Sequence, residues 1–210
     1  MKLWTQPLGP VQTNGFVISN DDNEGIVIDP GMEPDAMIQE IGSMDIKAIL
    51  LTHAHFDHIG GLEQVMKHTN APVYIHSEEQ SWLSTPELNG SARWPAVLEP
   101  LVINIESTAI EDGQRLEFAG FDIEVLHTPG HSPGSVSFYF AKHDLVIAGD
   151  TLFAGSIGRT DLQGGDYDRL INCIQTKLLT LPPGTAVYPG HGPSTTVKAE
   201  AQFNPYVGQL

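Results

Sequence analysis

The chain has 210 residues, with 26 acidic and 10 basic side chains and a formal net charge of −16 when histidine is neutral. A surface this acidic repels phosphate backbones and no basic run offsets it, which argues against nucleic-acid binding. No apolar run approaches the length of a membrane span and the N-terminus lacks the apolar core of a signal peptide, so we expect no membrane partner. The length permits one large domain, and we expect a single domain over residues 1–210.

Cysteine usage is typical of a reducing compartment. The single cysteine, Cys173, cannot form an internal disulfide and lies on the apolar face of a predicted helix. We therefore expect a buried, inert thiol and a cytoplasmic protein. The 21 glycines and 15 prolines indicate many turns between short apolar segments, a pattern typical of a mixed α and β chain.

In chain order, the N-terminal part alternates short apolar runs with turns. The pattern predicts strands over 14–19, 25–29 and 47–51 and a helix over 33–41. The turn 20–23 joins the first two strands as a hairpin. Asp29 ends the second strand, where it can either orient a metal ligand or simply form a turn.

The run from Thr52 to His58 places four ligand-type side chains within six residues: His53, His55, Asp57 and His58. It lies between the strand 47–51 and a predicted helix over 62–67. Residues two apart in extended backbone point to the same side, so His53 and His55 can face one point. Asp57 and His58, on the turning chain, can face a second point beside it. Imidazole and carboxylate ligands at this density indicate zinc, iron or manganese rather than a helix cap with solvent-facing histidines.

The central part continues with short strands. The pattern predicts strands over 72–76, 123–127, 135–140 and 145–148. Residues 84–100 are rich in Pro, Gly and Ser, which predicts a long loop or a broken helix. Three isolated histidines, His68, His76 and His143, are expected at the surface.

Three later strands end in further candidate ligands. His131 lies in a tight Gly/Pro turn between two strands, Asp150 follows a fully apolar strand, and His191 follows Pro189-Gly190. A buried carboxylate at Asp150 is costly without a partner, and two cations would supply one. With the earlier group these residues make a set of seven candidate ligands, five histidines and two aspartates.

These residues, in this order, resemble the metallo-β-lactamase superfamily, and the resemblance runs from Asp29 to His191. It implies an α/β fold, an αββα sandwich of two mixed β-sheets packed face to face with helices outside. It also implies two divalent metal ions per chain, with zinc as the expected metal and iron or manganese as alternatives. The resemblance assigns His53, His55 and His131 to one metal and Asp57, His58 and His191 to the other, with Asp150 bridging both.

Two stretches, 149–161 and 188–196, are similar to the glyoxalase II thioesterases in their small bacterial form. This likeness implies a hydrolase that cleaves a small-molecule thioester such as S-lactoylglutathione or a related S-(2-hydroxyacyl) thiol. Two cations lower the pKa of a bridging water toward ~7. The thiolate leaving group, with a pKa of roughly 8.5, needs little acid assistance. Asp57 is mainly a ligand, and it is also the candidate to accept the proton of the attacking hydroxide.

Several alternatives stay open at this point. The stretch 158–161 also resembles persulfide dioxygenases, which use one iron, and a lactonase or a non-catalytic binding module are further alternatives. Larger glyoxalase II enzymes carry a C-terminal helical extension that helps bind glutathione, whereas only 19 residues follow His191 here (210 − 191). The identity of the thiol and the oligomeric state are therefore not predicted. Arg159 is a candidate for binding a substrate carboxylate, with an ion pair to Asp161 or Asp166 as the alternative.

Overall fold

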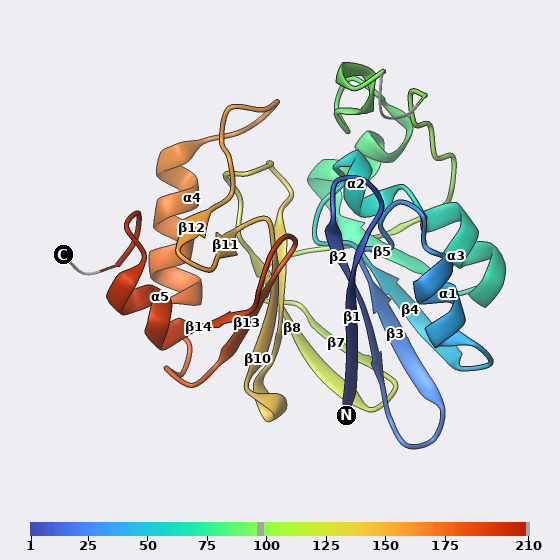
Figure 1. The fold of residues 1–210 in the computed structure, drawn as a ribbon, viewed down its shortest axis with the longest axis horizontal. Coiled ribbons are helices and arrows are strands. Elements are labelled where there is room, and N and C mark those ends of the chain that lie inside the picture. The colour runs from blue at the N-terminus through green and yellow to red at the C-terminus, as the bar shows by residue number, and fades with distance from the viewer. Residues whose placement is uncertain (96–98, 209–210) are drawn as a thin grey trace. The chain divides into compact units, whose positions relative to one another are not determined.

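The computed structural model describes residues 1–95 and 99–208, and its chain divides into two compact units. The first unit comprises residues 1–110 and 117–121, and the second comprises 111–116 and 122–210. The chain contains two mixed six-stranded β-sheets flanked by helices (Figure 1), which confirms the predicted α/β fold class. The expectation of a single domain over residues 1–210 stays a prediction.

The sheet of the first unit has the strand order β1-β2-β3-β4-β5-β6. Its strands are β1 (Lys2–Leu8), β2 (Thr13–Ser19), β3 (Glu24–Ile28), β4 (Asp45–Leu50), β5 (Val73–His76) and β6 (Thr108–Ile110). The first three strands are antiparallel neighbours, and from β3 to β6 each neighbouring pair is parallel. The predicted hairpin is confirmed, with Phe16 opposite Ile28. The strands β1 and β6 were not predicted.

In the described part of this unit, the α-helices are α1 (Asp35–Ile41), α2 (Phe56–Ile59) and α3 (Leu62–Thr69). Parallel strands need crossover connections, and α1 and α3 lie in the connections on either side of β4. Both helices lie against one face of the sheet (Figure 1), where Met37 and Val65 are buried in one apolar cluster with Val27 and Ile49. This packing holds β4 in place, so the segment that follows it starts from a rigid support.

The connection after β5 contains two 3₁₀ helices, η1 (Ser77–Ser84) and η2 (Ser91–Arg93). The predicted loop over 84–100 is irregular apart from η2, and its residues 96–98 lie outside the described part. The prediction that His76 lies at the surface is wrong, because it is only 2% exposed. His76 ends β5, and its Nδ1 accepts a hydrogen bond from the backbone N–H of Glu78 at the start of η1. His68 and His143 are exposed, as predicted.

The sheet of the second unit has the order β14-β13-β10-β9-β8-β7. Its strands are β7 (Arg115–Phe118), β8 (Phe121–His127), β9 (Val136–Phe140), β10 (Leu145–Gly149), β13 (Ala186–Pro189) and β14 (Thr195–Thr196). The strands β8, β9 and β10 are antiparallel neighbours, β10 and β13 are parallel, and the turn η3 (Ala141–His143) joins β9 to β10. Two short strands, β11 (Leu152–Phe153) and β12 (Ser156–Ile157), form a separate hairpin.

Two helices lie beside this sheet (Figure 1): α4 (Tyr167–Cys173), which continues as the π-helix η4 (Ile174–Leu178), and α5 (Val197–Phe203). Leu170 and Leu178 pack with Val146 and Val187 of the sheet in one apolar cluster. Cys173 belongs to the same cluster and is 4% exposed, which confirms the predicted buried thiol. Burial raises the pKa of this thiol to about 12, so it stays protonated at neutral pH.

Among the described residues, every helix is too short or too polar to cross a membrane.

Candidate metal centre

The four ligand candidates of the first unit lie between the end of β4 and the first turn of α2. His55, the residue before α2, is still extended, with φ −68° and ψ 144°. His53 and His55 lie two residues apart with ring centroids separated by 4.8 Å. Asp57 and His58 belong to the first turn of α2. All four residues are buried, with a relative exposure of 7% or less.

These four side chains converge within the first unit. The ligand atoms of His53 and His55 lie within 4.8 Å of each other, and the same limit holds between His53 and His58 and between Asp57 and His58. The rings of His53 and His58 are closer still, with centroids 4.1 Å apart. The structure therefore brings together the four residues that the sequence placed in one short motif.

Asp29 supports two of these histidines from the end of β3. It is fully buried, and its φ of +49° lies in the left-handed region that aspartate tolerates better than most residues. Its carboxylate accepts hydrogen bonds from the backbone N–H and the hydroxyl of Thr52 at 2.8 and 2.6 Å, and from Nδ1 of His58 at 2.9 Å. Because the Thr52 hydroxyl donates its hydrogen bond to Asp29, the same hydroxyl oxygen accepts a hydrogen bond from Nδ1 of His53 at 3.1 Å. Both histidines thus hold their proton on Nδ1 and keep a lone pair on Nε2.

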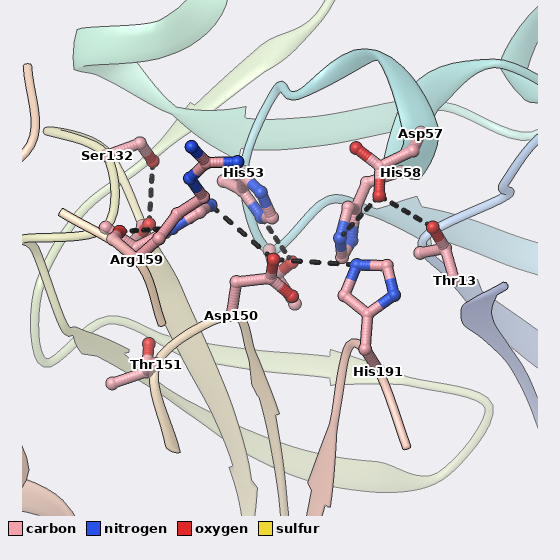
Figure 2. Close-up of polar contacts among 12 residues, drawn as sticks. Thr13, His53, Asp57, His58, Ser132, Asp150, Thr151, Arg159 and His191 are labelled. Atoms are coloured by element: carbon pink, nitrogen blue, oxygen red, sulfur yellow. Dashed lines mark hydrogen bonds and ion pairs between the residues drawn. The ribbon is translucent and has the colours of Figure 1, made fainter. Parts of the chain in front are cut away.

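Two further polar contacts hold the motif in place. The hydroxyl of Thr13 donates to Oδ2 of Asp57 at 2.7 Å (Figure 2). Glu79, a fully buried residue of η1, accepts a hydrogen bond from the backbone N–H of Ala54, between the first two histidines, at 2.6 Å. Sequence reasoning missed Thr13, Thr52 and Glu79, because none belongs to a motif and only their contacts distinguish them.

The three ligand candidates of the second unit lie at strand ends. Asp150 directly follows β10, and His191 follows β13, its parallel neighbour. In the register of these two strands, Gly149 lies opposite Pro189, which brings Asp150 and His191 to the same sheet edge. Oδ2 of Asp150 lies 3.6 Å from Nε2 of His191 (Figure 2) and also 3.6 Å from Nε2 of His131. One carboxylate oxygen is therefore equally distant from two imidazole nitrogens.

His131 is oriented by the backbone of the segment that follows Asp150. Its Nδ1 lies 2.8 Å from the carbonyl oxygen of Arg159. Because a carbonyl oxygen only accepts hydrogen bonds, Nδ1 of His131 carries the proton and Nε2 carries the lone pair. Gly158, the residue before Arg159, lies close to the backbone of Asp150: a Cβ added to Gly158 would fall 1.8 Å from the backbone oxygen of Asp150. Only glycine fits this approach.

The donor chemistry of each unit fits a divalent cation. In the first unit, the Nε2 lone pair of His58 lies 3.5 Å from Oδ2 of Asp57. In the second, the Nε2 lone pair of His131 lies 3.6 Å from Oδ2 of Asp150. Two acceptors at these separations repel each other unless a positive charge binds both. Imidazole nitrogen and carboxylate oxygen are the ligands that zinc takes at about 2.0–2.2 Å, and they also suit iron and manganese.

The side chain of Arg159 forms an ion pair within the second unit. Its guanidinium donates two hydrogen bonds to Asp161, both at 2.8 Å, and is about half exposed. This contact lowers the pKa of the Asp161 carboxyl from its ordinary 3.8 to about 2. The structure thus contains the ion pair considered as the alternative for Arg159, while binding of a substrate carboxylate stays a prediction.

The sequence pattern of the Metallo-beta-lactamase superfamily matches residues 8–191. The chain belongs to this superfamily. The match covers every ligand candidate described above, from His53 to His191, and it places the chain in a family of metal-dependent hydrolases. The resemblance noted from the sequence is therefore confirmed.

Two relatives within the superfamily match this chain over nearly its whole length. "Probable metallo-hydrolase YqgX" of Bacillus subtilis is 46% identical, covering 99% of this chain and 98% of the relative. "Hydroxyacylglutathione hydrolase GloC" of Haemophilus influenzae is 36% identical, and the match covers 99% of this chain and 98% of the relative.

Solved structures of the superfamily share the fold. The crystal structure of the BLEG-1 B3 metallo-beta-lactamase has a TM-score of 0.93 and 44% identity, covering 98% of this chain and 99% of that one. The crystal structure of TTHA1623 in a di-iron-bound form has a TM-score of 0.84 and 38% identity, and the match covers 98% of this chain and 100% of that one.

Proposed function

We propose that this protein is a dinuclear metallo-hydrolase that cleaves thioesters of S-(2-hydroxyacyl) thiols, with S-lactoylglutathione as the model substrate. The resemblance to the superfamily assigns the ligand candidates to two metal ions. One metal would be held by His53, His55 and His131 and the other by Asp57, His58 and His191, with Asp150 as a candidate ligand of both.

The observation that carries this proposal is the position of Asp150. Its Oδ2 lies 3.6 Å from Nε2 of both His131 and His191, two residues assigned to different metals. A carboxylate in this position is suited to serve two cations. The di-iron form of TTHA1623, at 38% identity, supports a count of two. The GloC relative, at 36% identity, supports the substrate class.

The chemistry divides between the metals and the chain. Two bound divalent cations would supply a hydroxide at neutral pH and polarise the thioester carbonyl. Asp29 and the carbonyl of Arg159 keep the Nδ1 protons in place, so the Nε2 atoms of His58 and His131 stay ligands. Thr13 holds Oδ2 of Asp57, our candidate to accept a proton during the reaction. Water adds to the acyl carbon, the C–S bond breaks, and the products are a hydroxy acid and a thiol.

We propose zinc as the metal, with iron as the alternative that the di-iron relative supports. The proposed partner is the small-molecule thioester alone, since a net charge of −16 disfavours nucleic acid. A cytoplasmic setting suits a substrate built on a free thiol and a chain whose single cysteine is not paired.

The test combines metal analysis with a thioester assay. The purified full-length chain is loaded with zinc or iron, its metal content per chain is measured, and thiol release from S-lactoylglutathione is followed with a thiol reagent. We expect two metals per chain and thiol release that is lost in Asp150→Ala and kept in Asp168→Ala, a carboxylate on the exposed face of α4. Absence of thiol release from this and other thioesters, with the metals bound, would overturn the proposal.

The same preparation separates the competing functions. One iron per chain with oxygen consumption on glutathione persulfide indicates the dioxygenase, and turnover of acyl lactones alone indicates a lactonase. A second candidate function is β-lactam hydrolysis, because the structure at 44% identity is described as a B3 metallo-beta-lactamase. Nitrocefin cleavage without thioester cleavage would favour it.

A further inference from the structure

Glu200 of α5 is a buried carboxylate that the proposed function does not use. It is 4% exposed. Its Oε1 accepts a hydrogen bond from the hydroxyl of Thr195 at 2.6 Å, and its Oε2 accepts from the backbone N–H of Gly155 at 2.9 Å and the amide of Asn204 at 2.7 Å. A buried carboxylate is costly unless donors satisfy it, and three donors do so here. The contact with Gly155 links α5 to the hairpin β11–β12, which begins two residues after Asp150.

The tip of this hairpin is anchored twice by the C-terminal segment. Glu200 binds the N–H of Gly155, and the amide of Asn204 donates to the carbonyl of Ser156 at 3.0 Å. The hairpin itself is short, since Leu152 pairs with Ile157 and Phe153 with Ser156. A two-residue pair of strands has little stability of its own, so the anchors at its tip set its position.

Both ends of the hairpin carry part of the proposed metal centre. Asp150 lies two residues before β11. Arg159, whose carbonyl orients His131, lies two residues after β12. Between them, the N–H of Gly158 donates to the carbonyl of Thr151 at 3.3 Å, and Gly158 leaves no room for a side chain against the backbone of Asp150. A shift of the hairpin therefore moves Asp150 and the support of His131 together.

We propose that Glu200 is a positioning residue of the metal centre, which acts through the β11–β12 hairpin on Asp150 and His131. The inference rests on the proposed function, because it assumes that these two residues bind metal. The hydrogen bonds of the Glu200 carboxylate described above go to Gly155, Thr195 and Asn204, and not to Asp150 or His131. The proposed effect of Glu200 is therefore on the geometry of the ligands and not on the chemical step.

The experiment compares zinc affinity in three variants of the full-length protein by competition with a chelator. Glu200→Ala removes the anchor, and we expect zinc binding to weaken by about tenfold, the lower end of the range for residues that support metal ligands. Glu200→Gln is the rescue. Its amide oxygen can face Gly155 and Asn204 while its amide nitrogen donates to the Thr195 hydroxyl, so we expect affinity within about twofold of wild type. Gln202→Ala, on the exposed side of α5, is the matched control.

A purely structural role is tested by a second destabilised variant. Ile123→Ala opens a cavity at a fully buried position of β8, outside the apolar cluster that contains Leu152 of the hairpin, and lowers thermal stability. Affinities are measured where circular dichroism shows every variant folded. If Ile123→Ala weakens zinc binding as much as Glu200→Ala, or if Glu200→Ala binds zinc like wild type, the inference is wrong. If the wild-type protein binds neither zinc nor iron, both the proposed function and this inference are wrong. If wild type binds metal without cleaving thioesters, only the substrate proposal fails.

Discussion

Nδ1 of His58 donates a hydrogen bond to Oδ2 of Asp29 at 2.9 Å, although the two residues are 29 positions apart. The contact follows from sheet register. The strands β3 and β4 are parallel, with Ile28 opposite Leu50, so Asp29 and the segment after β4 leave the sheet at the same edge. Asp29 accepts from Thr52 as well, and Thr52 accepts from His53. One carboxylate therefore sets the proton positions of two ligand candidates.

Replacement of Asp29 by asparagine tests this arrangement. The amide nitrogen of Asp29→Asn would point a donor at Nδ1 of His58 or at the Thr52 hydroxyl, which favours the proton on the wrong imidazole nitrogen. We expect metal affinity to fall by about 10- to 100-fold, as much as in Asp29→Ala. Chelator competition measures the change, with the exposed Asp35→Asn as the matched control. Wild-type affinity in Asp29→Asn would contradict this assignment.

Gly158 provides a steric test of the second unit. A Cβ at this position falls 1.8 Å from the backbone oxygen of Asp150, so Gly158→Ala must displace the main chain. Because a misplacement of about 1 Å costs on the order of 100-fold in rate, we expect a thioesterase loss of at least that size. The comparison variant is Gly184→Ala, whose added methyl meets nothing within 4 Å. Equal turnover in the two variants would show that Asp150 tolerates the shift.

Metal removal should destabilise the folded chain. Ligands that bind only the native state stabilise it by about 2.7 kcal/mol at a free concentration 100 times the dissociation constant. For a chain of this size that corresponds to a rise in Tm of roughly 5–10 °C. Calorimetry of the chelator-treated and the zinc-loaded protein measures the difference. An unchanged Tm after demonstrated zinc loading would mean that the metal also binds the unfolded chain.

Cys173 should be inert in the folded protein. Burial raises its thiol pKa to about 12, so almost no thiolate is present at pH 8. We expect no reaction with a disulfide reagent over minutes under native conditions, and one thiol per chain in guanidinium. Rapid native labelling would show that α4 opens readily.

The ion pair between Arg159 and Asp161 should persist into acid. Arg159 lowers the folded-state pKa of Asp161 from 3.8 to about 2, so the stabilising contact is fully present above pH 4 and is lost as pH falls through 2. An NMR titration of the Asp161 carboxyl should have its midpoint near pH 2 and move toward 3.8 in Arg159→Ala. A midpoint near 3.8 in the wild type would indicate that the guanidinium points elsewhere, for instance toward a substrate.

The sequence predicted the elements whose signal is local. Short apolar runs identified β2 to β5 and β10, and alternation of side chains identified β8 and β9. The strand β1 was missed because it contains Pro7 and exposes most of its side chains, so its extended conformation depends on pairing with β2. His76 was misplaced for a similar reason, since its burial follows from the start of η1 beside it.

By itself, the sequence determined which residues are candidate metal ligands and that His53, Asp150 and His191 come after strands, because residue type and strand-end position are properties of short segments. Only the tertiary structure decided what supports them. It is the Arg159 carbonyl, not its side chain, that holds His131, and Asp29 acts on His53 through Thr52. The contacts of His131 with Arg159 and of Asp29 with Thr52 join residues more than 20 positions apart, and their geometry is set by strand register and packing, which no local pattern encodes.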